Sequence, residues 1–72
     1  APNDPYLAYV YAVALHDEGA PAKAIDVLDK ALQANPYHPG LLGAMSNYLQ
    51  ESGDVERAGE YSRRLDSVSQ PD

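Results

Sequence analysis

The most reactive side chains of this sequence lie together at positions 16–18, where His16, Asp17 and Glu18 follow one another. Histidine and carboxylates are the groups that proteins use for general acid–base catalysis and for metal binding. At the end of a helix, however, consecutive side chains point in different directions, because one turn takes about 3.6 residues. We therefore expect a structural or surface role for these residues, and neither a metal site nor an acid–base pair.

The other candidates for chemistry lack partners at a useful spacing. His38 stands 22 residues from His16 and is followed directly by Pro39, so we expect a turn residue. The glycines are isolated and do not form a phosphate-binding loop. No serine has a histidine at a spacing suitable for a general base; the serines are Ser46, Ser52, Ser62, Ser67 and Ser69. The sequence therefore predicts no catalytic residue, no metal site and no cofactor.

Composition narrows the classes of partner. Eleven acidic residues against five basic ones give a net charge of −6. Binding to a phosphate backbone or to an anionic membrane surface depends on lysine and arginine, so this balance argues against both kinds of partner. Cysteine is absent, which excludes disulfides and thiolate metal sites. No apolar run approaches the roughly 18 residues that span a bilayer. An acidic surface favours solubility and, at most, a basic or apolar partner.

Apolar side chains recur at helical spacing in four segments of the chain, and these segments must position the candidate residues named above. We expect helices at about 6–17, 22–33, 40–51 and 55–68. Asp4 with Pro5, and later Asp54, are signals for helix starts. Gly19 and Gly53 follow the first and third segments, where a tight helix exit needs a positive φ. The fold class is therefore all-α, with four antiparallel helices in one domain over residues 1–72.

The first and second segments differ in their apolar faces. The second segment has one inner face, formed by Ala24, Ile25, Val27, Leu28, Ala31 and Leu32. The first segment is apolar over more than half of its circumference, with Leu7, Tyr11, Ala14 and Leu15 on one face and Tyr6, Tyr9 and Val13 beside them. Such a helix should contact neighbours on two sides.

The landmarks of the first half return 34 residues later. The first copy, counted from Pro5, has the motif residues Ala8, Tyr11, Ala12, Leu15, Gly19, Ala24, Leu28, Ala31 and Pro36. The second copy, counted from Pro39, has Leu42, Met45, Ser46, Leu49, Gly53, Ala58, Ser62 and Leu65. On these residues the chain resembles the tetratricopeptide repeat (TPR) family. The resemblance implies two stacked helical hairpins, at about 5–38 and 39–70, as a fragment of an α-solenoid. The second copy departs from the family pattern at Ser62 and Leu65, so we expect the fourth helix to pack with a shifted or looser face.

Two hairpins are fewer than the about three that stable arrays of this kind need. Pro2 stands 34 residues before Pro36, in the place of the closing proline of a preceding hairpin. We therefore expect an excised part of a longer protein, with a charged fourth helix suited to the C-terminal end of an array.

A weaker resemblance concerns residues 9–16 and 36–39. They are similar to the C-terminal repeat tails of some extracytoplasmic multihaem c-type cytochromes. No Cys-x-x-Cys-His occurs, so no haem function is implied. The compartment stays open between the cytoplasm and a bacterial periplasm.

In the family that the chain resembles, the first helix of each hairpin lines a groove that binds peptides. Carried over by position, this groove contains Tyr6, Tyr9, Val13 and His16, and from the second copy Gly40, Gly43, Asn47 and Gln50. Tyrosines opposite glycines give an aromatic wall with room for a backbone, and amide side chains can bond a peptide's main chain. Clamping of a partner's terminal carboxylate is not expected, because every lysine and arginine falls on a second helix.

The resemblance thus implies a non-catalytic protein-interaction or assembly module that binds a protein or peptide. One alternative is a structural spacer or capping repeat, with self-association through unpaired repeat faces. Another is an accessory domain of an enzyme or electron carrier. A binding module keeps its groove tyrosines exposed, whereas a spacer hides them and shows concentration-dependent melting.

Overall fold

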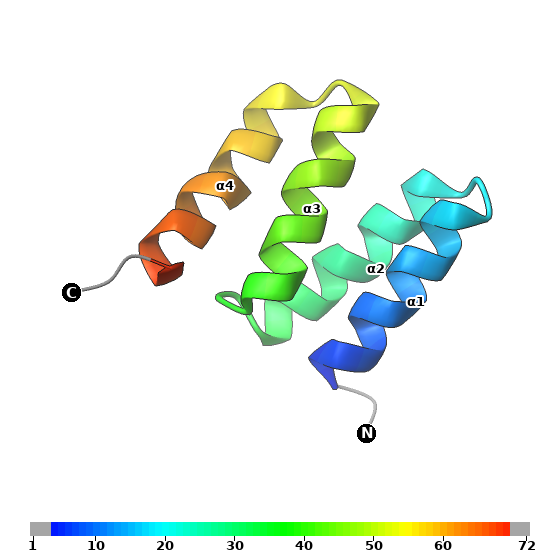
Figure 1. Cartoon of the computed structure of the whole chain (residues 1–72), viewed down its shortest axis with the longest axis horizontal. Helices are drawn as coiled ribbons and strands as arrows, with labels where there is room; N and C mark the ends of the chain where they lie inside the picture. Colours follow the sequence, from blue (N-terminus) through cyan, green and yellow to red (C-terminus); the bar gives the residue numbers. More distant parts are fainter. Residues whose placement is uncertain (1–3, 70–72) are drawn as a thin grey trace.

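The computed structural model describes residues 4–69, which form four α-helices and no strand. They are α1 (Pro5–Asp17), α2 (Pro21–Ala34), α3 (Pro39–Ser52) and α4 (Val55–Ser69), shown in Figure 1. Every helix end lies within one residue of its expected position, and the all-α fold class is confirmed. Pro2 and residue 70 lie outside the described residues.

The helix ends follow from local side chains. Asp4 caps α1, because its carboxylate accepts a hydrogen bond from the Tyr6 N–H at 2.9 Å. His38 does the same for α3, where its Nδ1 accepts from the Leu41 N–H at 3.3 Å. The residue expected in a turn is therefore also a helix cap. After α1 and α3 the chain turns on Gly19 (φ 85°) and Gly53 (φ 92°), as the sequence predicts.

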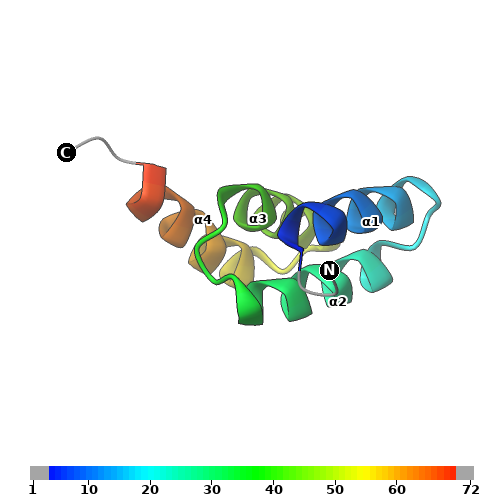
Figure 2. The same ribbon diagram turned by 90° about the horizontal axis from the view of Figure 1, so that it is seen from below.

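The helices form two hairpins that pack side by side in two layers. Figure 2 shows α1 and α3 in one layer and α2 and α4 in the other. Helix α3 packs against both α4 and α2, and α1 packs against α2 and, along a smaller area, α3. The expectation that the first helix contacts neighbours on two sides is confirmed. The resulting slab measures 38 × 32 × 16 Å.

The core lies where the two hairpins meet. Its buried residues are Ala12, Ala24, Leu28, Leu32, Leu41, Leu42, Met45, Tyr48, Leu49 and Ala58. The alanines at 12, 24 and 58 allow the paired helices to approach closely. Ser46 is also buried, and its hydroxyl donates to the Ala58 carbonyl at 3.1 Å and is hydrogen-bonded to Ser62. These hydrogen bonds join α3 and α4 of the second hairpin. The side-chain contacts between α1 and α2 of the first hairpin are apolar.

The outer helices contribute much less to this core. Of α1 only Ala12 is fully buried, and of α4 only Ala58. Leu7 and Tyr11, which were expected on one apolar face of the first helix with Ala14 and Leu15, are 53% and 58% exposed. Among residues 4–69, no helix covers these two side chains.

Candidate partner-binding site

The predicted groove residues of α1 lie on the exposed side of the α1–α3 layer. We call Tyr6, Tyr9 and Val13 the tyrosine stripe, because their spacing of three and four places them along one side of the helix. Tyr6 is 66% exposed, Tyr9 is exposed to a smaller degree and Val13 is half-buried. The stripe is therefore a surface feature that the core does not use.

Helix α3 brings four predicted residues to the same layer, and they differ in their surroundings. Gly40 lies beside the stripe, since a Cβ there would approach Cδ1 of Tyr9 to 4.0 Å. A Cβ on Gly43 would instead contact Leu65 of α4 at 3.8 Å, so the two glycines do not form one wall opposite the tyrosines. Asn47 and Gln50 are exposed, and neither amide has a hydrogen-bond partner within residues 4–69.

His16 has the most specific environment of the predicted residues. Its ring stacks on Tyr48 of α3, with centroids 4.2 Å apart and planes 3° from parallel. Its Nε2 lies 2.6 Å from Oε1 of Glu51, and its Nδ1 lies 3.7 Å from Oδ1 of Asp17. His16 therefore links α1 to α3 at their carboxyl-terminal ends.

These contacts correct one expectation. His16 and Asp17 were expected to point in different directions, but their side chains come within ion-pair distance of each other. Sequence reasoning also missed Tyr48 and Glu51. The 34-residue period is the signal that could have found them. It places residue 50 at the position that His16 occupies in the first copy, so residues near position 50 lie beside His16 when two first helices run parallel.

The carboxylates change the titration of this histidine. The hydrogen bond to Glu51 is the main cause that raises the pKa of His16 above 6.5, and the partial loss of water around the ring opposes it. The Glu51 charge and Asp17 add to the increase. Burial likewise raises the pKa of Tyr48. The described residues contain no group of three or more His, Asp or Glu side chains arranged to hold a metal ion. The His16 contacts thus form a structural link between the hairpins.

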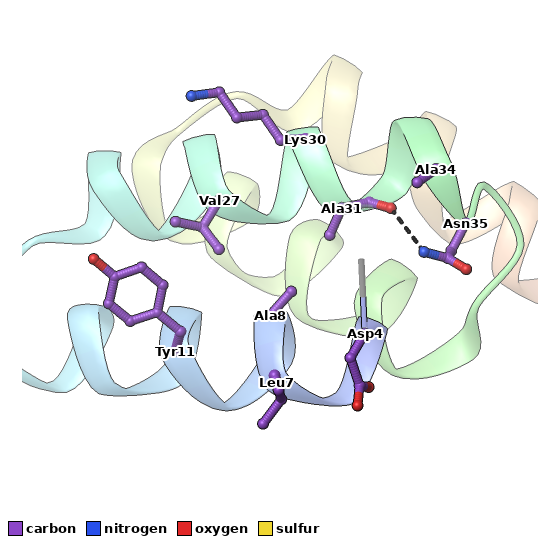
Figure 3. A pocket seen from close by; sticks show the side chains of 9 residues that line it. All are labelled: Asp4, Leu7, Ala8, Tyr11, Val27, Lys30, Ala31, Ala34 and Asn35. Carbon is purple, nitrogen blue, oxygen red and sulfur yellow. Dashed lines mark hydrogen bonds between the residues drawn. The ribbon is translucent and has the colours of Figure 1, made fainter. Parts of the chain in front are cut away.

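A second surface lies at the open side of the first hairpin. A groove of about 420 Å³ runs between α1 and α2, and we call it the end groove. Its lining residues are Asp4, Leu7, Ala8, Tyr11, Val27, Lys30, Ala31, Ala34 and Asn35. In Figure 3, Tyr11 and Ala8 face Val27 and Ala31, and the Asn35 amide donates to the Ala31 carbonyl. The sequence reasoning did not predict this groove.

The repeat explains why the end groove is apolar. Leu7 and Tyr11 correspond, 34 residues later, to Leu41 and Met45, which are fully buried between the two hairpins. The end groove is therefore built like a surface that another hairpin covers, although nothing within residues 4–69 covers it.

Comparisons with known proteins agree with this architecture. A family model described as tetratricopeptide repeat matches residues 15–70, which is well over half of the chain. No curated protein and no solved structure matches the chain. Among residues 4–69, no helix has the length and apolar character needed to cross a membrane.

Proposed function

Because the chain belongs to the tetratricopeptide repeat family, we propose that it is a protein-interaction module that binds a segment of a partner protein along α1 and α3. Repeats of this family generally mediate protein–protein interactions, and they typically serve as scaffolds rather than as enzymes. The finer part of the proposal is the surface, which consists of the tyrosine stripe, His16, Gly43, Asn47 and Gln50.

The observation that carries the proposal is the exposure of the tyrosine stripe. A 66% exposed Tyr6 beside a partly exposed Tyr9 gives apolar rings at the surface of a small acidic protein, where they contribute little to its core. Exposed apolar patches with polar neighbours are typical of interaction sites. Tyrosine suits such a site because its ring packs and its hydroxyl can still hydrogen-bond. Asn47 and Gln50 supply free amides for a peptide backbone.

Panning of a random peptide library on the immobilised protein tests this proposal. The test variant is Tyr6→Ala/Tyr9→Ala, and the matched control is Tyr11→Ala, which removes a similarly exposed ring from another side of the same helix. We expect peptides that are enriched on the parent and on the control but lost on the double variant. Peptides that bind the double variant equally well, or no enrichment at all on the parent, contradict a groove-binding function. Circular dichroism confirms that each variant is folded.

The end groove favours a second candidate function, that of a structural spacer or capping repeat. At the opposite end of the molecule, most of the exposed side chains of α4 are polar or charged, among them Glu60, Arg63 and Asp66, and the large apolar exceptions are Val55 and Val68. One apolar end and one polar end suit the last unit of a helical stack, whose outer face must be compatible with water. In that function the end groove is covered by another hairpin or by a second copy of the chain.

Sedimentation over a range of protein concentrations tests the second candidate. Self-association that Leu7→Glu abolishes, and that Tyr6→Glu on another side of α1 leaves intact, supports covering of the end groove. A monomer at every concentration excludes the second copy as the covering partner.

A further inference from the structure

We propose that the segment bound along α1 and α3 is positively charged, and that its lysine or arginine side chains pair with Asp17 and Glu51. The inference rests on the proposed function and specifies the chemistry of the partner. It follows from the distribution of charge between the two layers, from the ends of α1 and α3, and from the distance between the tyrosine stripe and the carboxylates.

The two layers of the molecule differ in charge. All five lysine and arginine residues lie on α2 and α4, namely Lys23, Lys30, Arg57, Arg63 and Arg64. Two carboxylates near those helices have a cationic partner, in the pairs Lys30–Asp26 at 3.2 Å and Arg57–Asp54 at 4.0 Å. Asp17 and Glu51 have only the His16 ring between them. Their side chains are 74% and 53% exposed, so a ligand can reach both.

The position of these carboxylates strengthens the negative field. Asp17 lies in the last turn of α1 and Glu51 in the last turn of α3, and Glu18 follows α1 directly. The carboxyl-terminal end of a helix already has a partial negative charge, so acidic residues there are locally unfavourable. His16 is the one basic residue in these two last turns. Natural proteins accept such local conflicts mainly at functional sites. A cationic ligand removes the conflict.

The tyrosine stripe leads directly to the carboxylates. Asp17 continues the spacing of Tyr6, Tyr9 and Val13 along one side of α1. Asp17 lies eight positions after Tyr9, which corresponds to about 12 Å along a helix. An extended peptide covers that distance in about four residues. The surface therefore fits a segment with an apolar or aromatic anchor and a basic residue about four positions away. A tyrosine face also attracts a lysine or arginine head group.

An acidic segment fits this surface poorly. No lysine or arginine of α1 or α3 is available to meet a carboxylate, and placing like charges together costs binding energy and slows association. The charge distribution therefore selects a basic partner segment over an acidic one.

The test compares the charge of the peptides that the protein selects. The library is panned at low ionic strength on the parent, on Asp17→Asn/Glu51→Gln, and on Asp26→Asn/Asp29→Asn, which removes the same charge from α2. We expect peptides enriched on the parent to contain an excess of lysine and arginine over the starting library. That excess should persist on the α2 control and disappear on the double variant. Asp17→Asn alone keeps the 2.6 Å contact of His16 with Glu51 and should weaken the excess in the same direction.

Affinity measurements complete the test with the most enriched peptide. Measured by fluorescence anisotropy, the affinity of the peptide should fall by about tenfold when its basic residues are replaced by glutamine. Added salt should lower the affinity of the original peptide more than that of the glutamine-substituted peptide. Enriched peptides without excess basic residues, or an excess that survives in Asp17→Asn/Glu51→Gln, overturn the inference and leave the proposed function intact. No enrichment at all contradicts the proposed function, and the inference fails with it.

Discussion

The two hairpins have the same 34-residue pattern but very different burial. In α3, Leu41, Leu42 and Met45 are fully buried, whereas their counterparts in α1, Leu7, Ala8 and Tyr11, are exposed or half-buried. The local sequences predict two similar amphipathic helices. The difference arises because, in the part of the chain that the structure describes, the first hairpin packs on this side of α3 and no helix packs on the equivalent side of α1.

This difference separates stability from binding. The buried contacts of the molecule concentrate in α2 and α3, at the boundary between the hairpins. Helix α1 contributes a single fully buried residue and most of the large exposed apolar side chains. Substitutions on α1 should therefore change interactions with other molecules, and substitutions on α3 should change the free energy of unfolding.

Truncation of register-equivalent leucines tests this separation most strongly. Leu41→Ala should lower the free energy of unfolding by about 2–5 kcal/mol, because Leu41 is fully buried. That loss can equal the whole stability of so small a domain. Leu7→Ala, at a side chain that is 53% exposed, should cost less than about 1 kcal/mol. Denaturant titrations of both variants decide the point, and equal losses would show that the end groove is covered in solution.

The two glycine turns should behave alike, in contrast to the helices. Gly19 and Gly53 have φ of 85° and 92°, and a Cβ on either would meet no other atom within 4 Å. Substitution by alanine should therefore cost only the backbone strain of a positive φ, about 1–2 kcal/mol in each case. Thermal melting of Gly19→Ala and Gly53→Ala measures this. A much larger loss for one of them would mean that the hairpins also differ in their turns.

The helix boundaries could be predicted from the sequence because their causes are local. Asp4, Pro5 and Gly53 act within a few residues, and each marks a helix end in the structure as expected. The 34-residue period made it possible to predict also that the helices pair into two hairpins. The resemblance to the repeat family is confirmed by the matching family model.

Burial and long-range contacts could not be predicted in the same way. Leu7 has a core-like position in its helix, and only the absence of a packed neighbour leaves it exposed. The contact of His16 with Glu51 joins residues 35 positions apart, so local patterns do not contain it, and the 34-residue period indicates only that the two positions lie near each other. The binding function of the predicted groove residues and the resemblance to cytochrome tails both stay predictions.

The helix caps offer a smaller test, because Asp4 and His38 are equivalent positions that cap α1 and α3. Loss of a helix cap typically costs about 1 kcal/mol. Asp4→Ala and His38→Ala should each lower the free energy of unfolding by about that amount in denaturant titrations at neutral pH. Since α3 forms more of the core, His38→Ala should have the larger effect on cooperativity. An unchanged stability of His38→Ala would show that the 3.3 Å hydrogen bond does not persist in solution.

The smallest expected effect concerns the link between the hairpins at His16. Asp17 faces the ring from α1, and Glu51 and Tyr48 face it from α3. Because the pKa of His16 is raised in the folded state, its protonated form is stabilised by folding. The contribution to stability is therefore fully present below about pH 6.5 and is lost as the pH rises through the folded-state pKa.

Two measurements check this pH dependence. In a proton NMR titration, the pKa of His16 should fall in Glu51→Gln and stay at its parent value in Glu56→Gln, which removes an exposed carboxylate from α4. In thermal melts, the parent and Glu56→Gln should lose stability from about pH 6 to about pH 8.5 by a larger amount than Glu51→Gln does. A His16 pKa that is identical in the parent and in Glu51→Gln would mean that the 2.6 Å contact is not made in solution. In that case α1 and α3 meet at this end through the stacking of His16 on Tyr48 without the carboxylate contact, and α1 is more independent of α3 than the structure indicates.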